Sequence, residues 1–488
     1  MSPVSFQLFP NPSPSPSRIS PNALPGITPE ATEMVKKVLK DDYEKHHAFF
    51  NDQGFHNHVA HHVLAVWALG APKDVIQAAY DHDKIIQRQA YKSPGDITRD
   101  NFNDHLGDEN YYNAYVNYFI GAIKQKDAAA VLEEHVFSSA ANFASKGQSG
   151  EHPKMLGRFL GSLVHPMIHI GYGVEFNMPG LVAEGLAQAA VHGNRTGGIV
   201  PASTFLADPV PSAGLQKPAA PHAFTILSRV LKDENIKINI KPKDNDIEVY
   251  TYVLDKWADV ILGHVNEWAD FDATDAHLVE RKVEELQWTN VLIYALPGYS
   301  YSQVQGQEKK FNADFFSMHL VTSSLFLPSH IAVLSPHARH LLLRSYFAVS
   351  LTWYIARGKP DLHIKAFFDE TAAFPIVAAS QNGPGKISVL PLGSSTANPN
   401  PWFAILEQAI GHADDHLCKL QRTLAHYSAL YGSRTAGKAD FAETELLGAD
   451  RLDGTLFVRA AALTAEKLGQ DNLPPGYWDR SGFFAESK

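Results

Sequence analysis

The apolar positions between residues 55 and 70 predict a buried helix with an unusual number of histidines. Val59 and Val63 lie on one helical face, and Gly70 followed by Pro72 is typical of a helix end. Four histidines stand within seven residues of this stretch, namely His56, His58, His61 and His62. Buried imidazoles need partners, because an unpaired polar group in an apolar interior costs free energy. Those partners are carbonyls, carboxylates or a shared metal ion.

The helical period recurs along most of the chain and predicts an all-α fold with negligible β structure. Helices are expected over residues 29–50, 55–70, 72–89, 103–106, 111–144, 152–176, 178–192, 223–232, 246–270, 275–296, 312–326, 336–357, 360–373 and 401–431, and one more inside 448–469. The helix over 111–144 should break near residues 125–127, and Pro166 should kink the helix over 152–176. Only residues 236–240 and 387–392 resemble strands, and both are isolated.

The same pattern indicates two unequal parts of the chain. Residues 1–27 are rich in Pro and Ser and are expected to form an extended N-terminal arm. Residues 28–488 are expected to form one large, bundle-like α-helical domain, since no linker divides them. Two long segments, 193–222 and 376–400, are predicted loops and candidate lids over a site.

Composition narrows the class of protein. The 488 residues have a formal net charge of -10, which argues against nucleic acid or an anionic membrane as the main partner. A single cysteine, Cys418, excludes an intrachain disulfide. We see neither a secretory signal nor a membrane span, so a cytoplasmic location is expected. The unusual feature is 24 histidines against 42 Lys and Arg, which is a first indication of metal or proton chemistry.

Four segments place histidine in a helical setting. Three of them contain a histidine pair with i, i+4 spacing, the third being His412 with His416, and such a pair can aim both imidazoles at one ion. The candidate ligands are His58 with His62, His165 with His169, His319, and His416 with Lys419 one turn later. Imidazole-rich sites suit Fe, Zn, Cu or Ni. The spacing leaves open whether these residues are metal ligands or histidines paired within the core.

Other chemistries have weaker support. There is no His-Glu-x-x-His motif, and one Glu-x-x-His unit, Glu44 to His47, falls short of a di-iron pattern. No Gly-x-Gly-x-x-Gly follows a strand, so a Rossmann site is not supported. His412-x-Asp414 matches part of an iron triad, but Asp414 and Asp415 fit better as residues that orient His416 or lie exposed.

Two lysines have two interpretations each. Lys419 and Lys365 could lie along a helix with the ammonium group in water. Alternatively, a desolvated neutral lysine can react with carbon dioxide, and the carbamate is an anionic metal ligand. Such a ligand would supply the negative charge that a site made only of histidines lacks.

Several motifs together resemble the questin oxidase family of fungal polyketide pathways. They run in order from about residue 50 to 430 and comprise Phe55-His56-Asn57-His58-Val59-Ala60-His61-His62, His165-Pro166-Met167-Ile168-His169, Asp314-Phe315-Phe316-Ser317-Met318-His319 and Asp414-Asp415-His416-Leu417-Cys418-Lys419. One departure is Arg357-Gly358-Lys359-Pro360, where the family has Arg-Gly-Arg-Pro. The resemblance implies oxidative opening of a ring in an anthraquinone-like polyketide. It also implies a non-haem iron site, and some members have been described as NADPH-dependent.

We therefore predict an Fe(II) oxygenase, mono- or dioxygenase, that takes dioxygen and a flat aromatic substrate. The expected metal ligands come from His58, His62, His165, His169, His319, His416 and Lys419, the last as a possible carbamate, with Lys365 as the less favoured lysine. The expected catalytic residues are His58, His169 and His319. Six histidines exceed what one ion needs, so some should bind other ligands or substrate. Two alternatives remain, namely a metal-free, NADPH-dependent Baeyer–Villiger-type monooxygenase and a non-catalytic carrier of aromatic metabolites.

Overall fold

Helices form the regular structure of this protein. The computed structural model describes residues 6–144, 150–194, 196–206, 220–238, 246–304, 311–373, 400–469 and 478–484. Within these ranges there is no strand, only isolated bridges, so the all-α prediction is confirmed. Residues 236–238 are not a strand. The rest of that candidate, the candidate at 387–392, and most of the two predicted lids lie outside the described residues.

The described helices follow one another along the chain, joined by connections that range from one residue to long segments such as the one between α9 and α10. The α-helices are α1 (Pro29–Lys45), α2 (Val59–Ala68), α3 (Lys73–Asp83), α4 (Tyr112–Gln125), α5 (Ala128–Leu132), α6 (Ser139–Phe143), α7 (Met155–Phe159), α8 (Gly161–Glu175), α9 (Pro179–Val191), α10 (Ala223–Lys232), α11 (Asp246–Trp268), α12 (Ala276–Val304), α13 (Phe315–Ser324), α14 (Leu327–Val333), α15 (Pro336–Ala356), α16 (Ile364–Glu370), α17 (Pro401–Gly411), α18 (Asp415–Tyr431), α19 (Ala439–Ala442) and α20 (Leu456–Leu468). Short 3-10 turns lie between them, including one over Phe102–His105.

Some helix ends follow the expected local chemistry. Thr28 caps α1 by accepting a hydrogen bond from the Ala31 N–H at 3.2 Å. Gly70 ends the α2 region with φ +88°, a left-handed conformation that glycine adopts without a steric penalty. The expected break near 125–127 is present between α4 and α5, where Asp127 caps the second helix.

Two predicted helices are wrong in their continuity. Residues 401–431 form α17 and α18 instead of one helix, because Asp414 caps a new helix with its carboxylate on the His416 N–H at 2.9 Å. Residues 152–176 form α7 and α8, and the backbone is left-handed at Ser162, Leu163 and Val164. The regular part of α8 therefore begins after this turn, so Pro166 lies near its start and does not kink its middle.

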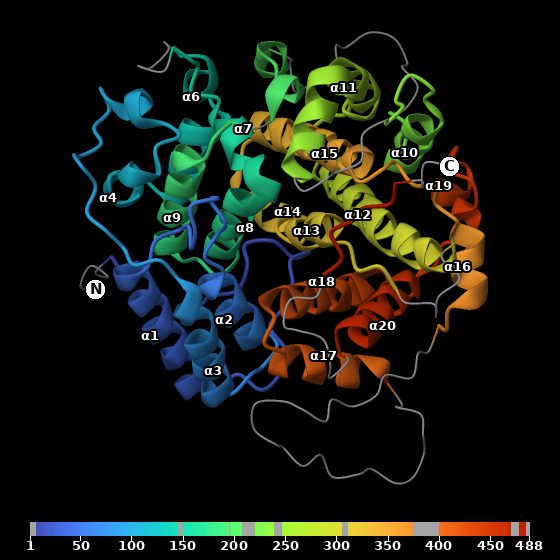
Figure 1. Ribbon diagram of the computed structural model, residues 1–488, viewed down its shortest axis with the longest axis horizontal. Coiled ribbons are helices and arrows are strands. Elements are labelled where there is room, and N and C mark those ends of the chain that lie inside the picture. The colour runs from blue at the N-terminus through green and yellow to red at the C-terminus, as the bar shows by residue number, and fades with distance from the viewer. Residues whose placement is uncertain are drawn as a thin grey trace.

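Four helices meet in the interior of the protein. Figure 1 shows α8 and α13 near the centre, α18 below them and α2 to the lower left, although these helices lie far apart in the sequence. Contacts join α13 to α8, α12, α15 and α18, and join α2 to α8 and α18. Their facing surfaces are apolar, with Val59, Leu320 and Leu417 all fully buried. Any polar side chain that points into this region is therefore held in a low-dielectric environment.

The N-terminal segment lies across these helices without forming one. Its backbone bonds to them, as in the Leu24 N–H to the Ala68 carbonyl at 2.7 Å and the Ser13 N–H to the Phe176 carbonyl at 3.1 Å. Ser20 lies 2.9 Å from Ser329 between their hydroxyl oxygens. The arm thus ties α2, α8 and α14 together.

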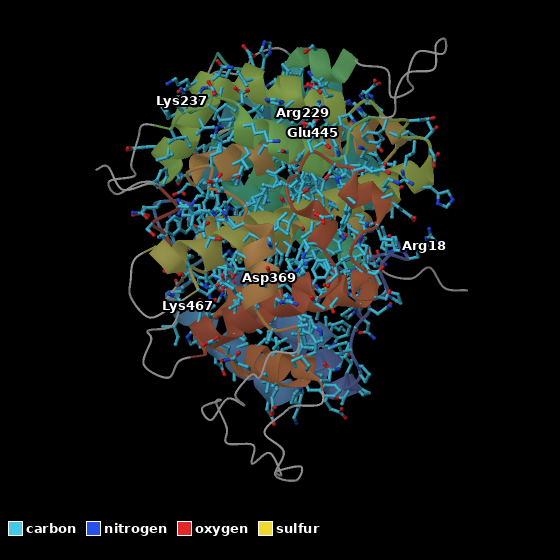
Figure 2. The ribbon with its side chains drawn as sticks, turned by 90° about the vertical axis from the view of Figure 1, so that its right-hand side faces the viewer. Arg18, Arg229, Lys237, Asp369, Glu445 and Lys467 are labelled. Atoms are coloured by element: carbon cyan, nitrogen blue, oxygen red, sulfur yellow. The ribbon has the colours of Figure 1, made fainter. Side chains whose placement is uncertain are left out.

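Charge is distributed over the outside of the helical body. Figure 2 shows Arg229 and Glu445 next to one another. Their 2.5 Å ion pair links α10 to the segment that follows α19. One described stretch, Phe315–Val333, is long and apolar enough to cross a membrane. It is 89% buried within the protein, as the core helix of a folded domain would be.

Candidate metal centre

Four histidines from four different helices form a closed ring of imidazoles. The distances between ring centres are 5.0 Å for His58 and His165, 4.9 Å for His165 and His319, 5.2 Å for His319 and His416, and 4.9 Å for His416 and His58. We call these residues the histidine ring. The sequence names all four as candidate ligands, and the fold brings them together.

Local backbone features place each member of the ring. His58 is the residue immediately before α2. His165 follows the left-handed turn at 162–164, whose strained backbone directs its side chain inward. His319 stands in the second turn of α13, and His416 is the second residue of α18, two positions after the capping residue Asp414.

Each imidazole of the ring is anchored through its Nδ1 atom. Nδ1 of His165 lies 2.6 Å from the Ser162 carbonyl oxygen, and Nδ1 of His319 lies 2.7 Å from that of Phe315. Nδ1 of His58 lies 3.0 Å from Asp415 Oδ2, and Nδ1 of His416 lies 3.2 Å from Asp415 Oδ1. A neutral imidazole that donates from Nδ1 carries its lone pair on Nε2, which is the tautomer that binds a metal ion.

The opposite nitrogens of the histidine ring, the Nε2 atoms, are the ones available to bind a ligand. Those of His58, His319 and His416 are buried and have no hydrogen-bond partner among the described residues. Three unpartnered ring nitrogens in one apolar interior would be costly if they had no purpose. They fit the requirement for a metal ion.

The spacing of the ring passes a simple geometric test for a shared ion. With metal–nitrogen bonds of about 2.1 Å, two imidazoles on one ion have ring centres roughly 4.6–5.3 Å apart when the angle at the metal is about 90–110°. The four neighbouring pairs lie at 4.9 to 5.2 Å. The all-nitrogen donor set is one that suits iron as well as zinc, copper or nickel.

Asp415 links two members of the ring to a buried lysine. Its Oδ2 atom lies 2.5 Å from Lys419 Nζ as well as 3.0 Å from His58. Asp415 could itself be grouped with His58 and His416 as a metal site, since their donor atoms lie within 4.8 Å. We assign it to orientation instead, because its oxygens meet both imidazoles at Nδ1 and leave Nε2 free.

Burial and charge keep most of the ring neutral. Desolvation, followed by the Lys419 ammonium, lowers the pKa of His58 to about 4. Desolvation and neighbouring imidazoles also lower the pKa values of His165 and His319. His416 differs, because Asp415 and Asp414 raise its pKa above the ordinary value despite its burial. A metal ion would therefore displace a proton chiefly from His416.

The other predicted ligands point elsewhere. Nδ1 of His62 lies 2.8 Å from Asp83 Oδ2, so the i, i+4 pair with His58 is divided between two environments. Nδ1 of His169 lies 3.1 Å from Nε2 of His61, outside the ring. Lys419 reaches the ring through Asp415, whereas Lys365 is exposed on α16.

Sequence reasoning missed the C-terminal segment that covers this site. Trp478 packs 6.2 Å from the His416 ring centre and donates from Nε1 to Asp414 Oδ1 at 3.1 Å. The guanidinium of Arg480 lies 4.2 Å from the ring centre of Phe315, which itself packs against His319. No period or motif signalled this contact, since the segment is short and lies more than 60 residues beyond α18's start.

Comparison with known proteins gives one family and several fungal relatives. The sequence profile of the family described as "Questin oxidase-like" matches residues 55–424. A Baeyer-Villiger oxidase, ptaJ, of Pestalotiopsis fici is 27% identical over 80% of each chain. A questin oxidase of Aspergillus terreus is 27% identical over 81% of this chain and 80% of its own. Oxidoreductase AflY of Aspergillus parasiticus is 26% identical over 81% of this chain and 72% of its own. The matched range contains the whole histidine ring.

Proposed function

Because the chain belongs to the questin oxidase-like family, we propose that it cleaves a ring of an anthraquinone-like polyketide oxidatively at a non-haem iron centre held by the histidine ring. The observation that carries the iron assignment is the set of orphaned Nε2 atoms at the ring, each with Nδ1 already anchored. Relatives named as Baeyer-Villiger and questin oxidases support oxygen insertion next to a carbonyl carbon.

His58, His165, His319 and His416 are the residues that would hold the ion. Bound iron supplies the means to react dioxygen with an organic substrate that has no other activating group. The chain's own residues prepare the site for this by holding three imidazoles neutral and by excluding water from the four-helix interior. Phe315 packs against both His319 and His416 at 4.7 and 5.1 Å, which keeps the two rings in place.

Lys419 has two proposed states. As an ammonium it pairs with Asp415 and favours neutral imidazoles nearby. As a carbamate it would give the ion an anionic ligand, and its contact with Asp415 would have to be replaced. Intact-mass measurement of the native protein, compared with Lys419→Met, separates the two through the added mass of one carbon dioxide.

The electron balance of the proposed reaction needs a reduced substrate. NADPH would first reduce the anthraquinone to its hydroquinone. Its hydride supplies two electrons and one proton, and solvent supplies the second proton. Dioxygen then adds both of its oxygen atoms as one ring carbon–carbon bond breaks, one carbon becoming a carboxylic acid and the other a phenol. A Baeyer–Villiger path reaches the same product with one oxygen atom from dioxygen, one lost as water, and one gained from water on lactone hydrolysis.

Isotopically labelled dioxygen distinguishes these paths on purified protein. Two labelled atoms in the ring-opened acid are expected for the iron proposal. One labelled atom, with full activity at less than about half an iron per chain, would overturn it in favour of the metal-free monooxygenase.

A pair of buried histidines provides the matched variants. His319→Ala should lose both iron and activity by more than about 100-fold, because it removes a ligand. His330→Ala is the control, since His330 is equally buried but bonds only the Met167 carbonyl at 3.1 Å. Equal loss of iron in both variants would argue against the histidine ring as the metal site.

A further inference from the structure

A second line of polar groups leads away from the histidine ring through α8 to α9. His61 Nε2 lies 3.1 Å from His169 Nδ1, and His169 Nε2 lies 3.5 Å from Glu184 Oε2. The three residues are 1%, 5% and 8% exposed, respectively. A row of two imidazoles and a carboxylate inside an apolar core needs an explanation, since each group loses solvation there.

The charge of Glu184 favours one tautomer of each imidazole. The carboxylate faces His169 Nε2 at 3.5 Å, a contact that is not a formed hydrogen bond, and its negative charge favours the hydrogen on Nε2, so that His169 Nδ1 holds a lone pair and accepts from His61 Nε2–H. His61 Nδ1 is then left with a lone pair, and this atom is buried with no hydrogen-bond partner in the part of the chain that the structure describes. The His61 ring centre lies 5.3 Å from that of His58, so the open end of the line is next to the histidine ring.

We propose that Glu184 receives, through His169 and His61, the proton that a phenolic substrate loses at the histidine ring. The inference rests on the proposed function in one respect, namely that the substrate is a phenol. The substrate O–H bond breaks and His61 gains N–H at Nδ1. His61 then loses its Nε2 proton to His169 Nδ1, and His169 loses its Nε2 proton to Glu184.

Within the protein only Glu184 changes its net charge in this transfer, while the neutral phenol becomes a phenolate. The two imidazoles exchange tautomers and stay neutral, which suits their burial. Burial raises the pKa of Glu184, His169 opposes this, and the Asp42 carboxylate on α1 raises it further. The other titratable groups that feel Glu184 are Tyr43 of α1 and Tyr112 of α4, and neither phenol is ionised at neutral pH because their pKa values are raised. Glu184 is thus a carboxylate that gains a proton readily.

A structural role for Glu184 would predict different behaviour. If the carboxylate only held His169 in place, glutamine would do so too, because its amide oxygen can face the same Nε2–H as an acceptor. Glutamine cannot take up a proton, however. Glu184→Gln therefore separates positioning from proton transfer, and Glu184→Asp restores the carboxylate on a shorter side chain.

The test uses the colour of a bound dye and needs neither iron nor turnover. Alizarin, a hydroxylated anthraquinone, changes colour when its phenol ionises. We expect iron-free wild-type protein to bind alizarin as the phenolate, and the midpoint of the colour change in Glu184→Gln to move up by at least about 1 pH unit, a tenfold change. Glu184→Asp should return toward the wild-type midpoint, and His330→Gln should match wild type.

Kinetics of the iron-loaded enzyme give the second readout. Glu184→Gln should lower kcat about 100-fold at neutral pH, with KM and iron content unchanged. The kcat of this variant should rise more steeply with increasing pH than that of wild type. Identical alizarin midpoints in wild type and Glu184→Gln would overturn the relay and leave ring cleavage standing. A shifted midpoint in a protein that opens no anthraquinone ring would support the relay and overturn the proposed function.

Discussion

At the scale of single residues, Asp415 determines the geometry of the histidine ring more than any ligand does. Its carboxylate reaches Nδ1 of His58 at 3.0 Å and Nδ1 of His416 at 3.2 Å from two different helices. His416, Lys419 and His58 together hold the pKa of its carboxyl well below the ordinary value, although burial opposes them. A permanent negative charge therefore sets the tautomer of two ligands at once.

Asp415→Asn should lower iron affinity by about 10- to 100-fold. The amide cannot accept from both imidazoles with the same strength, and it leaves the buried Lys419 ammonium without its ion pair. Iron content measured after dialysis against a graded chelator checks the prediction. Asp83→Asn is the matched control, because Asp83 lies 2.8 Å from Nδ1 of His62, a histidine outside the histidine ring. Equal losses of iron in both variants would contradict the assignment.

Part of the histidine ring could be predicted from the sequence, and the reason is physical. Apolar surroundings marked His58, His165, His319 and His416 as buried, and burial of imidazole is itself the signal of a site. The i, i+4 spacing does not bring His62 and His169 into the histidine ring, because spacing shows that two side chains share a helix face and not what that face meets. Glu184 and Trp478 carried no local signal at all, since their roles depend on contacts between distant segments.

At the scale of elements, two helix interruptions that the helical period does not predict are the ones that position His165 and His416. The sequence predicts a single helix over 401–431, although Gly411-His412-Ala413-Asp414-Asp415 interrupts the apolar pattern between α17 and α18. Asp414 instead ends the run, caps α18 through the His416 N–H, and accepts from Trp478. The left-handed turn at 162–164 does the same for His165, at an energetic cost that non-glycine residues rarely bear. Helix existence thus follows from periodicity, whereas interruptions follow from capping and tertiary contacts.

Asp414→Ala should weaken the iron site beyond its effect on stability. Loss of a cap costs about 1 kcal/mol of folding free energy, and here it also frees the start of α18, where His416 lies. Ser335→Ala is the comparison, because Ser335 caps α15 with its hydroxyl 3.4 Å from the Ala338 N–H. We expect similar thermal destabilisation in both variants and reduced iron content only in Asp414→Ala. Full iron occupancy in Asp414→Ala would show that the cap does not position His416.

At the scale of the whole molecule, the fold buries many imidazoles in the neutral state. Outside the histidine ring, desolvation lowers the pKa values of His47, His135, His330 and His426 to about 4. A few histidines oppose this trend, among them His82, whose pKa the Asp83 carboxylate raises. Protonation of these histidines therefore changes the free energy of unfolding of the whole protein, independently of the chemistry at the histidine ring.

The protein should lose stability steeply between pH 6.5 and about 4. In that window the unfolded chain binds protons on these histidines while the folded chain does not, so each depressed group lowers the free energy of unfolding by up to about 1.4 kcal/mol per pH unit. Above pH 6.5 the same groups are neutral in both states and contribute no pH dependence, whereas His82 contributes stability that is lost as pH rises. Thermal melts of the iron-free protein across this range measure the slope. His330→Gln should show a shallower decline than wild type, because one of the histidines with a lowered pKa no longer titrates on unfolding. A melting temperature that does not change between pH 6.5 and 4.5 would mean that these imidazoles are not held neutral in the folded state.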